Sequence, residues 1–285
     1  MNKTITIQNK QIGIEYPPFV VAEMSGNHNQ SLDRALQIVD AAAESGVHAI
    51  KLQTYTADTI TMNTNGPEFQ ISDKKSLWYG QSLYELYKKA YTPWEWHKPI
   101  FDHCKKLGLI CFSSPFDETA VDFLEKLNIP CYKIASPEIT HIPLIKKVAS
   151  TKKPIIFSIG IAKIHEIEEA IDTAKTNGCK DVILLKCTSS YPAPPEKTNL
   201  RAIPHMKELF KCEVGLSDHT LGVGTAIASV ALGATIIEKH FTIDRSEGGV
   251  DAAFSLEPFE LKMLVTETNR AWKSLGTVDY SVTNK

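Results

Sequence analysis

The 285-residue sequence lacks the features that mark several special classes of protein. It has no run of eighteen apolar residues, and residues 1–10 are polar with no basic stretch leading into an apolar core. Its formal net charge is −2 and it has no block of like charges, so it offers no electrostatic footprint for nucleic acid or an anionic membrane. We therefore expect a cytoplasmic protein without a nucleic-acid or membrane partner, in which a local site holds any anionic ligand.

The cysteines lack the spacing of a metal or disulfide framework. No CxxC pair is present, the intervals are irregular, and several cysteines lie within apolar, strand-like runs. Unpaired cysteine commonly behaves as a small, buried apolar residue. We interpret all six as reduced core thiols: Cys104, Cys111, Cys131, Cys179, Cys187 and Cys212.

What the sequence does contain is an ordinary globular composition, 43% hydrophobic and 22% charged. Short β-rich runs alternate with longer stretches of helical period. The predicted strands span residues 19–24, 49–54, 109–113, 131–135, 154–159, 182–187, 213–216 and 235–240. The predicted helices between them include 32–44, 94–107, 119–127, 164–176, 225–232 and 258–272, and many end at Gly or Asn, as at Gly46, Gly108, Asn128, Gly178 and Gly233.

Eight strands that alternate with helices predict a closed α/β barrel, the (β/α)₈ TIM barrel, as a single domain over residues 1–285. A doubly wound open sheet is the competing fold. That fold usually carries a glycine-rich turn after its first strand, whereas this chain has Met24-Ser25-Gly26-Asn27-His28 there. Residues 57–90 form a long aromatic insertion after the second strand.

Every predicted strand ends in polar residues, at the face where barrels of this type place their active sites. They are Glu23; Lys51 and Gln53; Ser113 and Ser114; Lys133 and Ser136; Ser158; Lys186 and Thr188; Ser217, Asp218 and His219; and Glu238 with His240. Solvated or mutually paired groups at the rim are the alternative interpretation. Because charge inside a barrel needs a partner or ligand, the set favours a site for a phosphorylated or carboxylated small molecule.

Two histidines end neighbouring strands. His219 follows the seventh predicted strand and His240 ends the eighth, so both imidazoles could point at one place. Neutral imidazoles suit a borderline divalent cation such as Mn²⁺, Zn²⁺ or Fe²⁺, and structural histidines with hydrogen-bond partners are the alternative. His28 could also face this end of the barrel.

At these residues the chain resembles the sialic-acid synthase family, over about residues 19–276. The matching segments are Ala22-Glu23, Asn27-His28, Ala49-Ile50-Lys51-Leu52-Gln53-Thr54, Ser113-Ser114-Pro115-Phe116-Asp117, Tyr132-Lys133-Ile134-Ala135-Ser136, Lys186-Cys187-Thr188-Ser189, Tyr191-Pro192, Gly215-Leu216-Ser217-Asp218-His219-Thr220 and Ile237-Glu238-Lys239-His240-Phe241-Thr242. The family joins phosphoenolpyruvate to an N-acetylated sugar aldehyde, with release of phosphate.

Within that family, an aromatic stretch looks like the pseudaminic acid synthase branch. It comprises residues 76–87 and Thr92-Pro93-Trp94-Glu95-Trp96-His97. Its rings could form a sugar pocket with an apolar wall for a 6-methyl group. Alternatively, Trp94, Trp96 and Tyr87 pack the long loop and its helix against the barrel.

The resemblance also implies roles for individual residues. Metal ligands fall on His219 and His240, with Mn²⁺ favoured and Mg²⁺ or Co²⁺ as alternatives, and Glu23 and Glu238 are the candidates for water activation and proton transfer. Contacts with phosphoenolpyruvate fall on Lys51, Ser114, Lys133, Ser136, Ser158, Ser189 and Ser217, and Lys186 is predicted to bind substrate as well. Sugar contacts fall on Gln53, Tyr191 and Asp251.

The family further implies a homodimer and a C-terminal antifreeze-like domain, which is not expected within these 285 residues. Two segments depart from the family pattern. Ser158-Ile159-Gly160-Ile161 stands where Ser-Thr-Gly-Met is common, which removes a hydroxyl near the phosphate, and Pro137 replaces an aromatic.

Three other functions remain open from the sequence. A synthase of N-acetylneuraminate or legionaminate differs only in its sugar. A Schiff-base aldolase would need a lysine that carries the substrate carbon. A non-catalytic barrel would bind metal and ligand without turnover.

Overall fold

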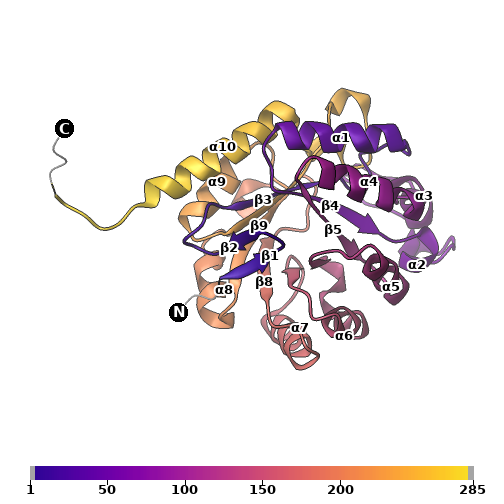
Figure 1. The fold of residues 1–285 in the computed structure, drawn as a ribbon. Helices are drawn as coiled ribbons and strands as arrows, with labels where there is room; N and C mark the ends of the chain where they lie inside the picture. The colour runs from indigo at the N-terminus through magenta and orange to yellow at the C-terminus, as the bar shows by residue number, and fades with distance from the viewer. Residues whose placement is uncertain (1–3, 282–285) are drawn as a thin grey trace.

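The computed structural model describes residues 4–281, so the first three and last four residues of the predicted domain lie outside the described residues. Eight parallel strands close a barrel in the order β10-β3-β4-β5-β6-β7-β8-β9 (Figure 1). The strands are β3 (Phe19–Glu23), β4 (Ala49–Thr54), β5 (Ile110–Pro115), β6 (Tyr132–Ile134), β7 (Ile155–Ser158), β8 (Val182–Cys187), β9 (Glu213–Asp218) and β10 (Ile236–His240). This confirms the predicted barrel, and each strand lies within two residues of its predicted bounds.

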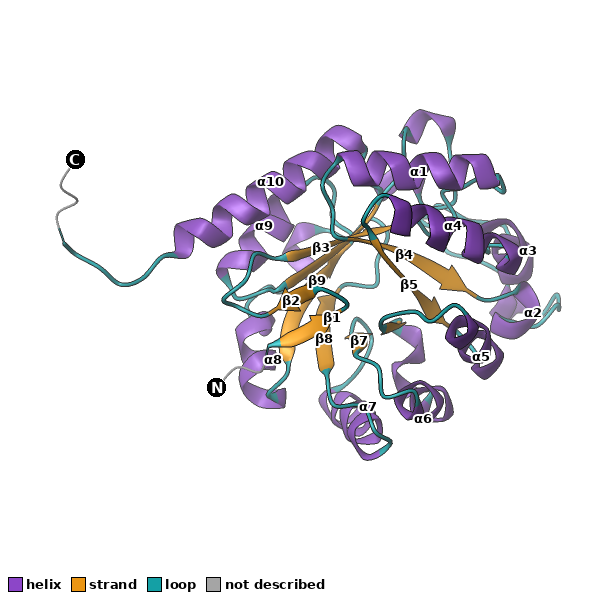
Figure 2. Ribbon diagram, in the orientation of Figure 1, coloured by secondary structure: helices purple, strands orange, loops and turns teal. Residues whose placement is uncertain are grey.

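Helices surround the barrel, as Figure 2 shows in purple around the orange strands. They are α1 (Leu32–Glu44), α2 (Ala57–Ile60), α3 (Leu83–Ala90), α4 (Trp94–Lys106), α5 (Glu118–Lys126), α6 (Ile142–Ser150), α7 (Ile164–Thr176), α8 (Ala202–Phe210), α9 (Gly224–Ala231) and α10 (Pro258–Leu275). The predicted insertion contains α2, α3 and the 3₁₀ helix η1 (Pro67–Phe69). The helices predicted from the sequence are confirmed.

Local sequence explains where the helices begin, end and pack. In α1, Ala35, Ile38, Val39 and Ala42 recur at helical spacing and are all buried, while the Ser31 side chain caps the helix by accepting from the Arg34 amide. The predicted helix-terminating residues all adopt positive φ: Gly46, Gly108, Asn128, Gly178 and Gly233. Each of these helices therefore turns back toward the next strand where the sequence indicates.

The apolar core has two layers, because successive side chains of a strand point to opposite faces. One layer fills the space between barrel and helices, with members such as Val20, Ile50 and Leu52. The other lies inside the barrel and includes Phe112 and Leu185. The six cysteines are buried, as predicted.

A short hairpin covers the N-terminal end of the barrel. Strands β1 (Ile5–Ile7) and β2 (Lys10–Ile12) pair antiparallel, and Ile5, Ile7 and Ile12 join the inner apolar layer (Figure 1). The sequence analysis did not predict these strands. Their apolar side chains cover the N-terminal end of the barrel interior. The polar end of the interior is the C-terminal end, which we call the mouth.

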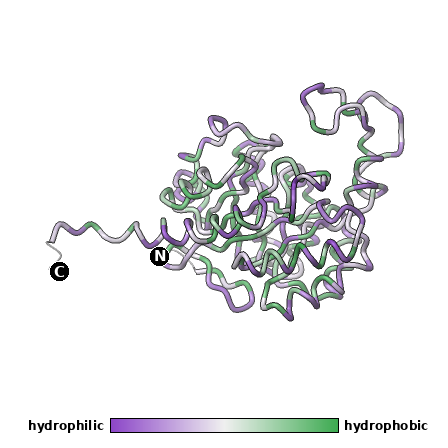
Figure 3. The backbone as a smooth tube through the Cα atoms, turned by 90° about the horizontal axis from the view of Figure 1, so that it is seen from above, coloured by the Kyte–Doolittle hydropathy of each residue, from purple (hydrophilic) through white to green (hydrophobic). Residues whose placement is uncertain are grey.

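Hydrophilic and hydrophobic stretches alternate along the chain in Figure 3. Among residues 4–281, no helix combines the length and apolar character needed to cross a bilayer.

Candidate active site

Polar side chains lie together at the mouth. They face the barrel interior because alternate residues of each strand point inward. Strand register sets Glu23 beside both Lys51 and His240, and Gln53 beside Ser114. Each belongs to the strand face that carries the inner apolar layer lower in the barrel. The predicted convergence of polar side chains at this end is therefore observed.

Two lysines and two glutamates form a buried charge cluster. Lys51 Nζ lies 2.9 Å from Glu23 Oε2 and 3.3 Å from Glu238 Oε1, and Lys133 Nζ lies 3.8 Å from Glu238 Oε1. Lys133 also donates to Ser158 Oγ at 2.6 Å. All four charged side chains are nearly inaccessible to solvent, so each depends on the others to offset the cost of burial.

The two glutamates differ in their affinity for a proton. Burial raises the pKa of Glu23, and the attraction of Lys51 does not offset it. Burial also acts to raise the pKa of Glu238, but Lys133 and Lys51 together outweigh burial and lower it. Two carboxyls with opposite shifts suit one proton donor and one carboxylate base.

Hydroxyls and a close backbone turn lie beside Lys133. Ser136 Oγ accepts from the Gly160 amide at 2.9 Å, and a methyl group on Gly160 would lie 2.3 Å from Ser189 Oγ. Ser114 Oγ is buried without a hydrogen-bond partner. A lysine with nearby hydroxyls and one uncommitted donor is suited to bind the oxygens of a phosphate or carboxylate.

The two predicted metal ligands stand together at the mouth. The ring centroids of His219 and His240 are 5.3 Å apart. His219 Nδ1 lies 2.9 Å from the Thr188 carbonyl, which leaves Nε2 as the second nitrogen, and His240 Nδ1 is buried without a hydrogen-bond partner. Burial, together with His219 and Lys51, holds the pKa of His240 well below its usual range, so this imidazole is neutral.

This donor pair fits a divalent cation that keeps open positions for ligands. Among residues 4–281, no three His, Cys, Asp or Glu side chains form an ion-enclosing group. Asp251 approaches from one side, with its Oδ2 3.6 Å from His240 Nδ1. Two imidazoles with open positions are chemically suited to a catalytic cation and not to a closed structural site.

Behind His219, a buried ion pair fixes the loop that follows β9. Lys239 Nζ donates to Asp218 Oδ2 at 2.8 Å and to the carbonyls of Thr220 and Gly222 at 2.7 and 2.8 Å. Both side chains face away from the barrel interior, because each alternates with an inward neighbour. The pair therefore positions His219 without touching a ligand in the mouth.

The predicted sugar contacts come from β4, from the loop after β8 and from the loop after β10. Gln53 Nε2 donates to Glu23 Oε1 at 2.9 Å, and Ser25 Oγ donates to Asp251 Oδ2. The Tyr191 ring packs against His219 with centroids 4.4 Å apart. Ser217 Oγ donates to Glu238 at 3.1 Å, which ties this part of the mouth to the charge cluster.

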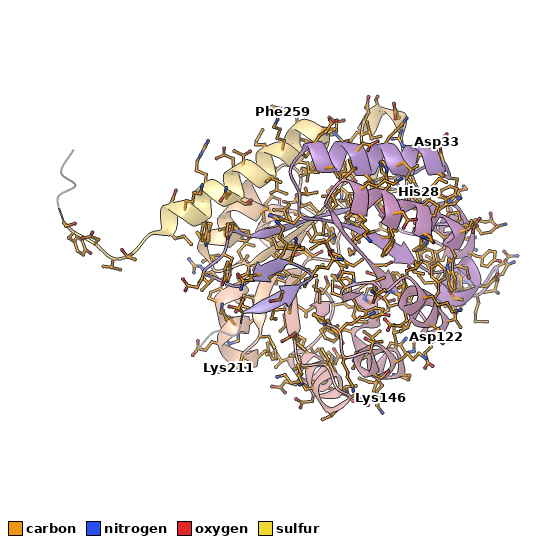
Figure 4. All side chains as sticks on the ribbon, viewed as in Figure 1. His28, Asp33, Asp122, Lys146, Lys211 and Phe259 are labelled. Carbon is orange, nitrogen blue, oxygen red and sulfur yellow. The ribbon has the colours of Figure 1, made fainter. Side chains whose placement is uncertain are left out.

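Some candidates from the sequence do not join this cluster. Lys186 alternates with Leu185 and Cys187, which face inward, and its Nζ donates to the Cys187 carbonyl at 2.7 Å. His28, labelled in Figure 4, is buried and contacts Trp96 and Thr92.

The two tryptophans of the aromatic stretch also have packing roles. Trp94 packs on Phe123, with ring centroids 4.8 Å apart, and donates its Nε1 hydrogen to the Tyr55 carbonyl. Trp96 contacts His28 edge-on. The packing interpretation therefore holds for both.

Two residues of the site were missed by the sequence analysis. Burial raises the pKa of Glu138 to about 7, and its Oε2 has no hydrogen-bond partner. Cys187 was grouped with the core thiols, but it faces the barrel interior, where burial acts to raise the pKa of its thiol and the neighbouring His219 and Lys133 outweigh burial and lower it to about 7. Position offered a signal for both, because Glu138 lies just after β6 and Cys187 is the last residue of β8.

Comparison with known proteins shows the family of the chain. Residues 38–280 match the NeuB family, which is most of the chain. The chain belongs to the NeuB family. The pseudaminic acid synthase of Helicobacter pylori is 45% identical over 260 residues, covering 91% of this chain and 76% of that protein.

Two further relatives show how far this family likeness extends. The N,N'-diacetyllegionaminic acid synthase of Campylobacter jejuni is 40% identical over 260 residues, covering 90% of this chain and 77% of that protein. The solved N-acetylneuraminic acid synthetase of Leptospira borgpetersenii superposes with a TM-score of 0.88 at 34% identity, covering 99% of this chain and 93% of that one. The NeuB-family barrel thus accounts for essentially all the described residues.

Proposed function

We propose that this chain condenses phosphoenolpyruvate with 2,4-diacetamido-2,4,6-trideoxy-β-L-altropyranose, giving pseudaminic acid and phosphate. The observation that carries the proposal is the buried Lys51, Lys133, Glu23 and Glu238 cluster beside the histidine pair, in a chain 45% identical to a pseudaminic acid synthase. Such a cluster provides both an anion site and two carboxyls of different proton affinity.

Phosphoenolpyruvate is assigned to the Lys133 side of the mouth. Lys51 and Lys133 neutralise its charges, and its phosphate and carboxylate oxygens accept from the nearby hydroxyls. Those hydroxyls belong to Ser114, Ser136, Ser158, Ser189 and Ser217. Lys186 has no part in this assignment, because its amine lies on the outer face of β8.

The sugar aldehyde is assigned to the side lined by Gln53, Tyr191 and Asp251. A divalent cation, Mn²⁺ with Mg²⁺ or Co²⁺ as alternatives, would be held by His219 and His240 and would supply Lewis acidity at the aldehyde oxygen. Tyr191 packs on the His219 ring and so limits where the aldehyde end of the sugar can lie.

The carboxyls carry the protons of the reaction. The enol carbon of phosphoenolpyruvate forms the new C–C bond with the aldehyde carbon, and Glu23, whose pKa burial raises, protonates the aldehyde oxygen. Water adds to the resulting cationic carbon and gives its proton to the Glu238 carboxylate. As the C–O bond to phosphate breaks, Glu238 returns that proton to the leaving phosphate, and the hydroxyl proton of the intermediate restores Glu23.

The test is phosphate release from phosphoenolpyruvate with Mn²⁺ and the altrose sugar, run beside N-acetylmannosamine and the legionaminate precursor. Metal-dependent release with the altrose sugar alone is the expected result, and it is lost in the His219→Ala/His240→Ala variant. Release only with another sugar would reassign the enzyme to the neuraminate or legionaminate reaction.

The same assay addresses the other classes of function. Turnover of no sugar, with metal and phosphoenolpyruvate still bound, would indicate a non-catalytic barrel. Borohydride trapping of a substrate carbon on Lys133 or Lys186 would indicate a Schiff-base aldolase.

We also propose that the chain forms a homodimer and acts in the cytoplasm, as the family resemblance implies. Sedimentation equilibrium tests the first point: a mass twice that of the 31.6 kDa chain is expected. A monomer at micromolar concentration would contradict it.

A further inference from the structure

The insertion after β4 sends a small hairpin across the mouth. Gln70 and Ser82 form an isolated antiparallel bridge, and the Ile71 amide donates to the Gln81 carbonyl at 3.0 Å. The Gly80 amide donates to the Ile71 carbonyl at 2.9 Å. These backbone bonds give residues 70–82 a defined shape, so the side chain of Trp78 has a defined position.

The one polar side-chain atom of Trp78 attaches it to the loop that follows β10, two strands along the barrel from β4. Its Nε1 donates to the Val250 carbonyl at 2.9 Å, in the loop between β10 and α10. Its ring centroid lies 6.1 Å from that of Tyr191, which in turn packs on His219. Trp78 therefore lies one aromatic ring away from the histidine pair.

The rings around Tyr191 form an apolar wall, defined here as Trp78, Tyr191 and Phe254. The centroids of Tyr191 and Phe254 are 5.2 Å apart. The Trp78 N–H is already committed to Val250, so the indole has no donor left for a ligand hydroxyl. A sugar hydroxyl pressed against the indole face of Trp78 would lose water without gaining a hydrogen bond.

A group of polar side chains lines another part of the mouth. Gln53, Ser25 and Asp251 bond to one another, and Glu23 lies next to them. A sugar whose aldehyde end is at the histidines therefore meets polar groups on one side and the apolar wall on the other. The part of the sugar that suits the wall is the part that carries no hydroxyl.

We propose that Trp78 is a specificity-determining residue, whose indole face packs against the terminal methyl carbon of a 6-deoxy sugar and disfavours a hydroxymethyl group there. The inference rests on the proposed function and names the residue that distinguishes a methyl from a hydroxymethyl group at C6 of the sugar. An apolar surface discriminates against one added hydroxyl by about 10- to 100-fold. Trp78 is expected to account for most of that ratio.

The experiment compares two sugars that differ only at C6: 2,4-diacetamido-2,4,6-trideoxyaltrose and its 6-hydroxy counterpart. Initial rates of phosphate release give kcat/KM for each sugar with the wild type, Trp78→Ala and Trp78→Phe. The wild type should prefer the methyl sugar by about 10- to 100-fold, and Trp78→Ala should bring the two sugars to within about threefold. Trp78→Phe, which keeps an aromatic face, should retain most of the preference.

Tyr79→Ala is the matched control, since Tyr79 is the next residue of the same hairpin and its side chain is 52% exposed. It should keep the wild-type preference, and the KM for phosphoenolpyruvate should stay unchanged in every variant. If Trp78→Ala leaves the ratio of kcat/KM for the two sugars unchanged, the inference is overturned. It is also overturned if Trp78→Phe loses the preference as fully as Trp78→Ala, because the selectivity would then come from the hydrogen bond with Val250.

The failure of this inference and the failure of the proposed function give different results. If the wild type turns over the methyl sugar but Trp78→Ala leaves the ratio intact, only the role of Trp78 is wrong. If the wild type turns over neither sugar, the proposed function is wrong and the role of Trp78 falls with it. Circular dichroism of each variant separates misfolding from a change in specificity.

Discussion

At the level of single residues, Lys51 holds two buried carboxyl groups in place, with Glu23 at 2.9 Å and Glu238 at 3.3 Å. Lys51→Met should lower the free energy of unfolding by about 3–5 kcal/mol, because it leaves buried negative charge without compensation. Urea unfolding measures the change. The control is Lys98→Ala, which breaks an exposed ion pair with Asp102 and should cost about 0.2–1 kcal/mol. Equal losses in the two variants would contradict the burial argument.

Glu138 should make stability depend on pH. Burial raises the pKa of its carboxyl from 4.5 to about 7, so the folded state holds a proton that the unfolded state has lost between those values. Its contribution to stability is therefore full below pH 4.5 and falls as the pH rises to about 7. Glu138→Gln should gain stability relative to the wild type across this interval, by about 3 kcal/mol at most. Paired urea titrations at pH 5 and pH 8 measure this, and parallel curves would exclude it.

The sequence located most of the candidate site because parallel strands of a barrel all end at one face. Glu23, Lys51, Lys133, Glu238 and His240 could be named in this way. Lys186 shows the limit of the approach, since β8 is apolar on both faces and its sequence does not say which set points inward. The proton affinities of Glu23 and Glu238 depend on contacts between distant strands, which no single segment encodes.

At the level of elements, Gly215 controls how closely β9 approaches its neighbours. A methyl group there would lie 2.4 Å from the Ile236 carbonyl oxygen and 2.7 Å from Leu185 Cδ2. Gly215→Ala should therefore destabilise the fold by about 1–3 kcal/mol. Gly224→Ala, in the first turn of α9 with no atom near the added methyl, should be neutral or stabilising by up to about 1 kcal/mol. Equal urea midpoints for the two variants would argue against a tight fit at β9.

The predicted bounds of the barrel strands and helices agree closely with the structure, because strands and helices have different spacings of apolar residues. The hairpin of β1 and β2 was not predicted, since three-residue strands give too short a pattern to recognise. The hairpin within residues 70–82 was also beyond the sequence, because its position depends on the contact between Trp78 and a loop far along the chain.

At the level of the whole molecule, a cation held by His219 and His240 should stabilise the folded chain. At a Mn²⁺ concentration a hundredfold above its dissociation constant, binding adds about 2.7 kcal/mol, which corresponds to a rise in Tm of several degrees. Differential scanning calorimetry with and without Mn²⁺, after treatment with a chelator, measures this without any substrate. The His219→Ala/His240→Ala variant should show no rise, and an equal rise in that variant would place the ion elsewhere.

The isoleucines of β1 and β2 cover the N-terminal end of the barrel interior, so within residues 4–281 we expect both substrates to enter the site through the mouth. Two substrates that share one entrance must bind in sequence. If phosphoenolpyruvate binds beside Lys133, nearer the barrel axis, and the sugar binds beneath Trp78 at the entrance of the mouth, the bound sugar prevents phosphoenolpyruvate from leaving. The kinetics should then be ordered. Phosphoenolpyruvate should bind first and the sugar second, and phosphate should leave only after the nine-carbon product has dissociated.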